Sequence, residues 1–181
     1  MMIKQLKIFF APINIIKEAL LQRINEPDKE FLNEDTLNLN SYIFPEYNPK
    51  CMKSVFWQPI NSNITVMATN LIDGWHTLGW ILNKEAKINM LEITIKNDYK
   101  LFNYNQERIV RVMWDGRWDF FEQGVPFKFE DINQYKKRFK AQRLSTEMII
   151  NYTKQFGCDI TDTSFYTTDI PAVYFSLISH V

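Results

Sequence analysis

The sequence predicts an α+β fold: a mostly antiparallel sheet, containing a meander with an Asp-Gly hairpin, packed by helices on one side. Short runs of β-branched and aromatic residues recur between Asn, Asp and Gly turn signals. Other segments carry apolar residues at spacings of three and four, which is typical of amphipathic helices. At 181 residues the chain can bury a substantial core. We therefore expect one globular domain over residues 1–181.

Residues 3–10 predict a first strand, and a helix follows it. Pro12 suits the first helical turn, where a missing N–H costs little. Apolar residues then recur at Ile13, Ile16, Leu20 and Ile24, which gives one buried stripe. Residues 25–54 show no sustained period and contain three prolines, so they predict a long irregular loop.

Strands are predicted at 54–60 and 64–69, with a turn at 61–63. The next segment, "DGWHTLGWILNKE", has two interpretations. Asp73 caps a helix in one, and Asp73-Gly74 turns a hairpin in the other. The apolar spacing favours the helix.

A β-hairpin is predicted around Asp115-Gly116. Strands at 88–96 and 99–105 precede it, and a β-rich run lies on each side of the Asp-Gly pair. This arrangement is typical of a type I′ turn, in which both central residues have positive φ. Counting outward from this turn pairs Trp114 with Arg117, and a cation–π contact is expected between them. The next pairs are Met113 with Trp118 and Val112 with Asp119. Arg111 is then a diagonal neighbour of Asp119.

Beyond a turn at Gln123-Gly124, "VPFKFE" is expected to continue the meander. Asp131 and Gln134 resemble a capping box and predict a helix over 132–143. Ser145 is placed to cap a last helix that ends at Gly157, and residues 171–178 predict a closing strand.

Overall charge excludes a global electrostatic attraction to nucleic acid or anionic lipid, because Lys plus Arg and Asp plus Glu number 21 each. Cys51 and Cys158 lie far apart without a CxxC pair, which argues against a zinc site or a disulfide scaffold. We expect no cofactor, no metal, no membrane association and a cytoplasmic protein.

Few residues suggest catalysis. The two histidines are His76 and His180, and the chain has no GxSxG, P-loop, GxGxxG or HExxH motif. An enzyme alternative would use Asp73 and His76 together with carboxylates of the meander. Those carboxylates are Asp115, Asp119, Glu122 and Glu130.

Two candidate partner-binding surfaces and one anion-binding surface follow from the charge pattern. The first is an acidic stretch within 25–54, and the second is the hairpin tip, where Trp and Arg are residue types that often dominate interfaces. The third is a run of cations on the helix predicted over 132–143, which forms a phosphate- or nucleic-acid-binding alternative. The acidic stretch consists of Glu26, Asp28, Glu30, Glu34 and Asp35. The hairpin tip consists of Trp114, Asp115 and Arg117. The run of cations consists of Lys136, Lys137, Arg138, Lys140 and Arg143.

A set of residues covering a little over half the chain resembles a pattern of small uncharacterised bacterial proteins similar to immunity or accessory proteins of secreted toxins. The pattern joins a DGW segment to a later RW-x-F-F, a G-x-x-x-x-FE, a Y-x-x-R and a final RL-T/S-x-E-x-L-x-x-Y-x-x-x-G. Met148 stands where the pattern has leucine. The matching residues are Asp73, Gly74, Trp75, Arg117, Trp118, Phe120, Phe121, Gly124, Phe129, Glu130, Tyr135, Arg138, Arg143, Leu144, Glu147, Tyr152 and Gly157.

This resemblance implies a non-enzymatic protein that neutralises a cognate bacterial toxin by binding it directly. The scarcity of histidine and of nucleophile motifs favours the same function over catalysis. A protein partner is therefore expected, a nucleic-acid partner is not, and self-association is compatible with the sequence.

Overall fold

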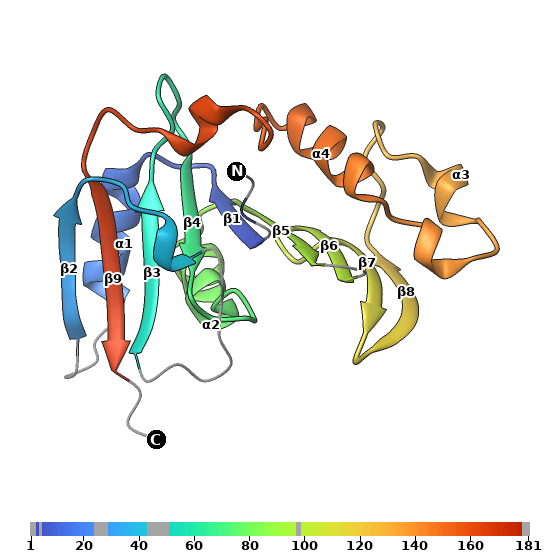
Figure 1. Ribbon diagram of the computed structural model, residues 1–181, viewed down its shortest axis with the longest axis horizontal. Coiled ribbons are helices and arrows are strands. Elements are labelled where there is room, and N and C mark those ends of the chain that lie inside the picture. The colour runs from blue at the N-terminus through green and yellow to red at the C-terminus, as the bar shows by residue number, and fades with distance from the viewer. Residues whose placement is uncertain (1–2, 4, 24–28, 43–50, 97–98, 179–181) are drawn as a thin grey trace. The chain divides into compact units, whose positions relative to one another are not determined.

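The computed structural model describes residues 3, 5–23, 29–42, 51–96 and 99–178 (Figure 1). These residues form nine strands and four α-helices in an α+β fold, as the sequence predicts. The chain divides into two compact units. Unit 1 contains residues 1–5 and 91–165, and unit 2 contains residues 6–90 and 166–181. The expected single domain stays a prediction.

Unit 2 contains a five-stranded sheet in the order β2-β9-β3-β4-β1, with β2 at its edge. Every pairing described among these strands is antiparallel. The strands are β1 (Gln5–Phe9), β2 (Lys29–Asp35), β3 (Cys51–Trp57), β4 (Thr65–Thr69) and β9 (Ala172–Ile178).

The expectation of an irregular loop over residues 25–54 is wrong for Lys29–Asp35, which forms β2. This strand pairs with β9 from the far end of the chain, and its register shifts between Glu30 and Leu32. Such an irregularity breaks the period of two by which a strand is recognised in a sequence. Within the same stretch, a short 3-10 turn forms at Asn40–Tyr42.

Two helices pack on one face of the unit 2 sheet (Figure 1). These are α1 (Ile13–Arg23) and α2 (His76–Trp80), the second continued by a π-helical turn at Ile81–Glu85. Ile13, Ile16 and Leu20 of the predicted stripe are confirmed as core, whereas Ile24 lies outside the described residues. Helix and sheet residues form one buried cluster that includes Phe9, Ile16, Leu20, Phe56, Leu78 and Phe175.

The helix interpretation of "DGWHTLGWILNKE" is confirmed, but Asp73 is not its N-cap. Gly74 and Trp75 both have positive φ, so the chain turns twice before α2 begins at His76. The Asp73 Oδ1 atom accepts the N–H of Trp75 at 2.9 Å. Trp75 is buried, with its ring centroid 5.5 Å from that of Phe175.

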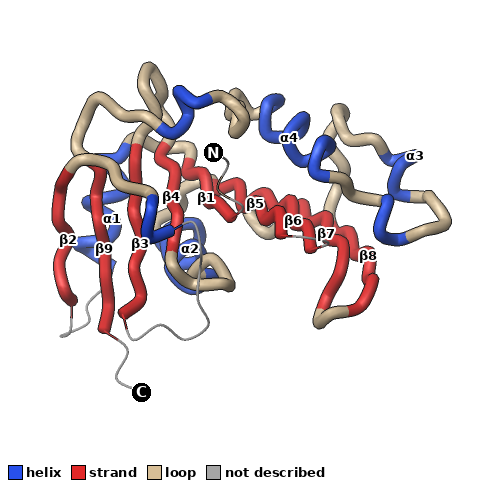
Figure 2. The backbone as a smooth tube through the Cα atoms, in the orientation of Figure 1, coloured by secondary structure: helices blue, strands red, loops and turns tan. Residues whose placement is uncertain are grey.

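Unit 1 is an antiparallel meander covered on one face by two helices (Figure 2). Phe102 lies 5.4 Å from the ring of Tyr152, and Phe120 lies 5.4 Å from that of Tyr135. The strand register places both phenylalanines on the same face. The elements are β5 (Met90–Lys96), β6 (Tyr99–Tyr104), β7 (Arg108–Trp114), β8 (Arg117–Gln123), α3 (Ile132–Tyr135) and α4 (Thr146–Gln155).

The Asp-Gly hairpin is confirmed, whereas part of its predicted register is wrong. Asp115 and Gly116 have φ values of 49° and 71°, as a type I′ turn requires, and Trp114 pairs with Arg117. The pairing then shifts at Met113, whose φ is 73°. In the observed register Val112 faces Phe120 instead of Asp119, and the expected pair of Met113 with Trp118 does not form.

Arg111 and Asp119 are diagonal neighbours, as predicted, with Nη2 and Oδ2 3.4 Å apart. Arg111 directly faces Phe121 across the strands, and its guanidinium lies 5.0 Å from that ring centroid. The side chain of Trp114 lies outside the described part of the structure. Its contact with Arg117 therefore stays a prediction.

Two further predictions after β8 are wrong. "VPFKFE" forms turns and extended chain instead of a strand. The helix expected over 132–143 ends at Tyr135, and only a 3-10 turn at Lys140–Gln142 follows. Half of the predicted capping box is present, since the Gln134 N–H donates to Asp131 Oδ1 at 3.1 Å, whereas the Asp131 N–H donates to Tyr152 instead of to the Gln134 side chain.

The last helix has the limits that its caps predict. Ser145 Oγ accepts the N–H of Met148 at 3.1 Å, and α4 runs from the next residue to Gln155. Gly157, with φ of 76°, turns the chain away from the helix end. The closing strand is also confirmed as β9.

Candidate functional site

Two of the five acidic residues predicted to contact a partner line a cavity. Glu26 and Asp28 fall outside the described residues, and the side chain of Glu30 is likewise not described. Glu34 and Asp35 lie at the end of β2. They form part of one wall of an open hollow of about 650 Å³.

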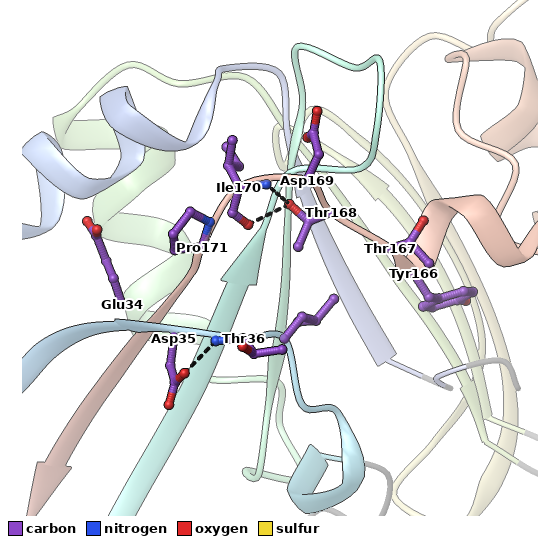
Figure 3. Close-up of a pocket in the computed structure, with 10 residues that line it drawn as sticks. Glu34, Asp35, Thr36, Tyr166, Thr167, Thr168, Asp169, Ile170 and Pro171 are labelled. Atoms are coloured by element: carbon purple, nitrogen blue, oxygen red, sulfur yellow. Dashed lines mark hydrogen bonds between the residues drawn. The ribbon is translucent and has the colours of Figure 1, made fainter.

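This acidic hollow lies entirely in unit 2, between residues 34–37 on one side and residues 166–171 on the other (Figure 3). Its polar rim carries the carboxylates of Glu34, Asp35 and Asp169. Its apolar lining comes from Leu37, Tyr166, Ile170 and Pro171.

Tyr174 of β9 holds the first wall in place. Its hydroxyl donates to the Thr36 carbonyl at 2.8 Å and accepts the N–H of Asn38 at 2.7 Å. Asp35 Oδ1 also accepts the Thr36 N–H at 2.6 Å. The backbone beyond β2 is therefore fixed by three hydrogen bonds, and little conformational freedom remains to be lost on binding.

The second wall is fixed to the turn between β3 and β4. The Ile60 N–H donates to the Thr167 carbonyl at 3.3 Å, and the Tyr166 ring lies 6.3 Å from that of Trp57. Thr168 Oγ1 donates to the Ile170 carbonyl at 2.9 Å (Figure 3). Both walls are thus preformed.

The hollow is acidic overall. Glu34 pairs with Lys17 of α1, and both side chains are exposed. Asp169 is exposed and makes no hydrogen bond or ion pair within the described residues. The carboxylates of Glu34 and Asp35 leave β2 in different directions, and that of Asp169 belongs to the other wall (Figure 3). Lys17 neutralises Glu34, so the net negative charge of the hollow comes from Asp35 and Asp169, which suits the binding of a cationic group.

Sequence reasoning missed Asp169 and the whole second wall. No local signal could have found them, because the two walls come from opposite ends of the chain. Tyr174, which fixes the first wall, lies 136 positions from Asn38. Only the pairing of β2 with β9 brings these segments together.

A second polar cluster, the Arg108 network, lies in unit 1: Arg108, Glu130, Tyr135 and Tyr152 are buried, and the exposed Glu122 completes it. Arg108 Nε donates to Glu130 Oε1 at 2.8 Å, and its Nη2 bonds Glu130 Oε2 and, at 3.0 Å, Glu122 Oε2. Nη1 donates to the Gln123 carbonyl at 3.0 Å. Burial alone lowers the pKa of Arg108, but the hydrogen bonds to Glu130 and Glu122 raise it above its ordinary value, so the guanidinium stays charged.

Two tyrosines complete the Arg108 network. The Tyr135 hydroxyl donates to Glu130 Oε2 at 2.9 Å and lies 3.1 Å from the Tyr152 oxygen. Tyr152 in turn accepts the N–H of Asp131 at 3.0 Å. This chain joins α3 and α4 to the ion pair, which makes it a clamp for the helices of unit 1.

Alkaline pH is expected to weaken this clamp. Burial, then the hydrogen bond with Tyr152 and the nearby Glu130 carboxylate, raise the pKa of Tyr135 well above its ordinary value. Above about pH 10 the Tyr135 hydroxyl loses its proton in the unfolded chain but keeps it in the folded chain. The free energy of unfolding therefore falls as pH rises above that value, and the contribution of Tyr135 is fully present below it. Tyr135→Phe should lower the free energy of unfolding by about 1 kcal/mol at neutral pH. It should also make the decrease of that free energy at alkaline pH less steep. Urea unfolding at several pH values checks this, and equal slopes for variant and parent would contradict it.

The residues of the enzyme alternative are mostly engaged elsewhere. Asp73 accepts the N–H of Trp75 in the turn before α2, and His76 is exposed at the start of that helix. They belong to unit 2, whereas the meander carboxylates belong to unit 1. Of those four carboxylates, Asp115 is exposed at the hairpin tip, Asp119 pairs with Arg111, and Glu122 and Glu130 share Arg108. A catalytic role for them stays a prediction.

The five predicted anion-binding cations lie in a folded loop instead of on one helix. We call residues 136–143 the basic loop. Arg143 Nε donates to the Lys137 carbonyl at 2.7 Å, and Gln134 Nε2 donates to the Gln142 carbonyl at 2.5 Å. Lys136, Lys137, Arg138 and Lys140 are exposed, as are Asp115 and Arg117 at the hairpin tip.

The described residues hold no group of three or more His, Cys, Asp or Glu side chains placed to bind a metal ion. None of the helices described is both long and apolar enough to cross a bilayer. Comparison of the chain with protein-family models, with curated proteins and with solved structures gives no match.

Proposed function

We propose that this chain is a non-enzymatic binding protein that neutralises a cognate bacterial toxin by direct binding, as immunity proteins do. The acidic hollow carries the proposal: it receives a basic segment of the toxin. The toxin as partner rests on the resemblance of the sequence pattern, and the hollow supplies a surface with suitable chemistry.

The preformed walls support binding. Tyr174 holds residues Thr36 and Asn38 before any partner arrives, so association loses little conformational entropy. The lining combines apolar side chains with a few polar groups, which is the composition of most recognition cavities.

The charge of the hollow supports a cationic partner segment. Asp169 is exposed and has no partner among the described residues, and Glu34 and Asp35 lie on the opposite wall. Because the chain as a whole is neutral, this attraction is local and acts at short range. The exposed Asp115 and Arg117 of the hairpin tip remain a second proposed contact.

The test starts with the tagged full chain, captured from the cells that encode it together with its bound proteins. A captured protein qualifies as the target if it arrests growth when expressed alone and if this chain relieves the arrest. Asp169→Lys should weaken binding by about tenfold or more, as expected when a like charge faces a basic segment. Titration calorimetry with the purified target measures the change.

Glu147→Lys is the matched control. Glu147 is exposed on α4, outside the hollow, and the substitution changes the net charge by the same amount. It should leave affinity and protection unchanged. Equal affinities for the two variants would remove the hollow from the proposal, and a chain that relieves no arrest would remove the toxin partner.

A further inference from the structure

An exposed aromatic side chain stands at the centre of the basic loop. Phe139 is 62% exposed, and its neighbours Arg138 and Lys140 are exposed cations. The Arg138 guanidinium lies 5.8 Å from the Phe139 ring centroid, so the charge remains beside the ring. Aromatic residues beside arginine are the residue types that most often anchor interfaces.

The basic loop has no acidic residue of its own. The sequence from Ile132 to Thr146 contains five cations and no Asp or Glu. Lys140 reaches Asp119 of β8 only at 3.9 Å, which is a long contact between two exposed groups. The Arg143–Lys137 and Gln134–Gln142 hydrogen bonds keep the loop in one shape. It therefore presents a preformed positive surface with an apolar centre.

The acidic hollow has the complementary features. Its volume of about 650 Å³ exceeds that of a phenyl ring and lies within the range of roughly 300–1,000 Å³ typical of ligand cavities. Leu37, Ile170 and Pro171 provide apolar lining. Asp35 and Asp169, on opposite walls, provide carboxylates that have no cationic partner among the described residues. A phenyl ring flanked by two cations matches this arrangement in both polarity and charge.

We infer that the basic loop of one copy of this chain docks into the acidic hollow of a second copy, with Phe139 inserted between the walls. The contact joins two different surfaces. In a pair, the copy that supplies the loop keeps a free hollow, and the copy that supplies the hollow keeps a free loop. Association therefore continues head to tail beyond two copies. The inference shares the hollow with the proposed function but does not depend on a toxin, and purified protein alone tests it.

The decisive measurement is sedimentation velocity of the full chain over a wide range of concentration. The average mass should rise with concentration and fall back at roughly 1 M sodium chloride, where the Debye length shortens to about 3 Å. Phe139→Ala and Asp169→Lys should each weaken association by about tenfold or more. Ile132→Ala, which shortens another exposed apolar side chain of unit 1, and Glu147→Lys should leave it unchanged.

Mixing the two disabled variants gives the sharpest test. Phe139→Ala retains an intact hollow, and Asp169→Lys retains an intact loop, so the mixture should form a one-to-one dimer that grows no further. A chain that is monomeric at every concentration would overturn the inference, as would association that both substitutions leave unchanged. Monomers that instead bind a single-stranded oligonucleotide through Phe139 would overturn it too and would assign the loop to nucleic acid.

The same variants separate this inference from the proposed function. If Asp169→Lys is monomeric yet still protects against the toxin, the hollow serves self-association and the proposed toxin site fails. If the parent is monomeric but loses toxin binding through Asp169→Lys, self-association fails and the toxin site stands.

Discussion

Gly124→Ala is expected to destabilise the protein by about 3 kcal/mol or more. Gly124 has φ of 82°, and a Cβ atom built there would lie 1.8 Å from the carbonyl oxygen of Glu107. That neighbour is backbone between β6 and β7, so it cannot rotate away as a side chain would. Urea unfolding followed by circular dichroism measures the change in free energy of unfolding.

Gly116→Ala provides the matched control within the same unit. Gly116 also has positive φ, of 71°, but a Cβ atom there would meet nothing within 4 Å. Its replacement should cost only the backbone strain of about 1 kcal/mol. Similar losses for both variants would show that strain, and not the collision with Glu107, dominates at Gly124.

Glu130→Ala is expected to lower the free energy of unfolding by about 3–5 kcal/mol, because it leaves a buried guanidinium without its main partner. The side chains of Arg108 and Glu130 are only 3% and 0% exposed. The substitution also removes the acceptor for the N–H of Phe127 and for the Tyr135 hydroxyl. Calorimetry should show the thermal midpoint falling by roughly 10 °C.

Glu122→Gln is the control for this prediction. Glu122 bonds the same guanidinium, but its side chain is 40% exposed and water can replace it. The expected loss is therefore below about 1 kcal/mol. A double variant, Arg108→Met with Glu130→Leu, should recover part of the loss of Glu130→Ala, because no buried charge is then left unpaired. Equal losses for Glu122→Gln and Glu130→Ala would contradict the assigned importance of burial.

Local signals in the sequence predicted most of the fold. The turn at Asp115-Gly116 and the cap at Ser145 each depend on residues within a few positions of one another, and both are present. The hairpin register was predicted only next to the turn. Beyond it, the irregularity at Met113 moves β8 by one residue, and Met113 carries no sequence signal for its positive φ.

Tertiary contacts explain the elements that sequence reasoning misplaced. The predicted basic helix stops at Tyr135, and beyond it side chains of Gln134 and Arg143 bond backbone carbonyls across the loop. β2 exists because β9 pairs with it from the other end of the chain. Neither interaction leaves a periodic pattern in the residues concerned.

The candidate sites were predictable only in part, for the same reason. Glu34 and Asp35 were identified from local charge, but Asp169 on the opposite wall was not. Glu130 was identified as a carboxylate of the meander, but not as the partner of Arg108. An ion pair between residues that are 22 positions apart has no local signature.

The clamp built from Arg108, Glu130, Tyr135 and Tyr152 has a consequence for tracing descent. Each of these side chains satisfies another in a buried setting, so the four should be inherited or replaced as a set. Their separations along the chain, 22, 5 and 17 positions, form a pattern that is independent of overall identity. Distant relatives can therefore be sought by an arginine, a glutamate and two tyrosines at that spacing, even where the rest of the sequence has diverged.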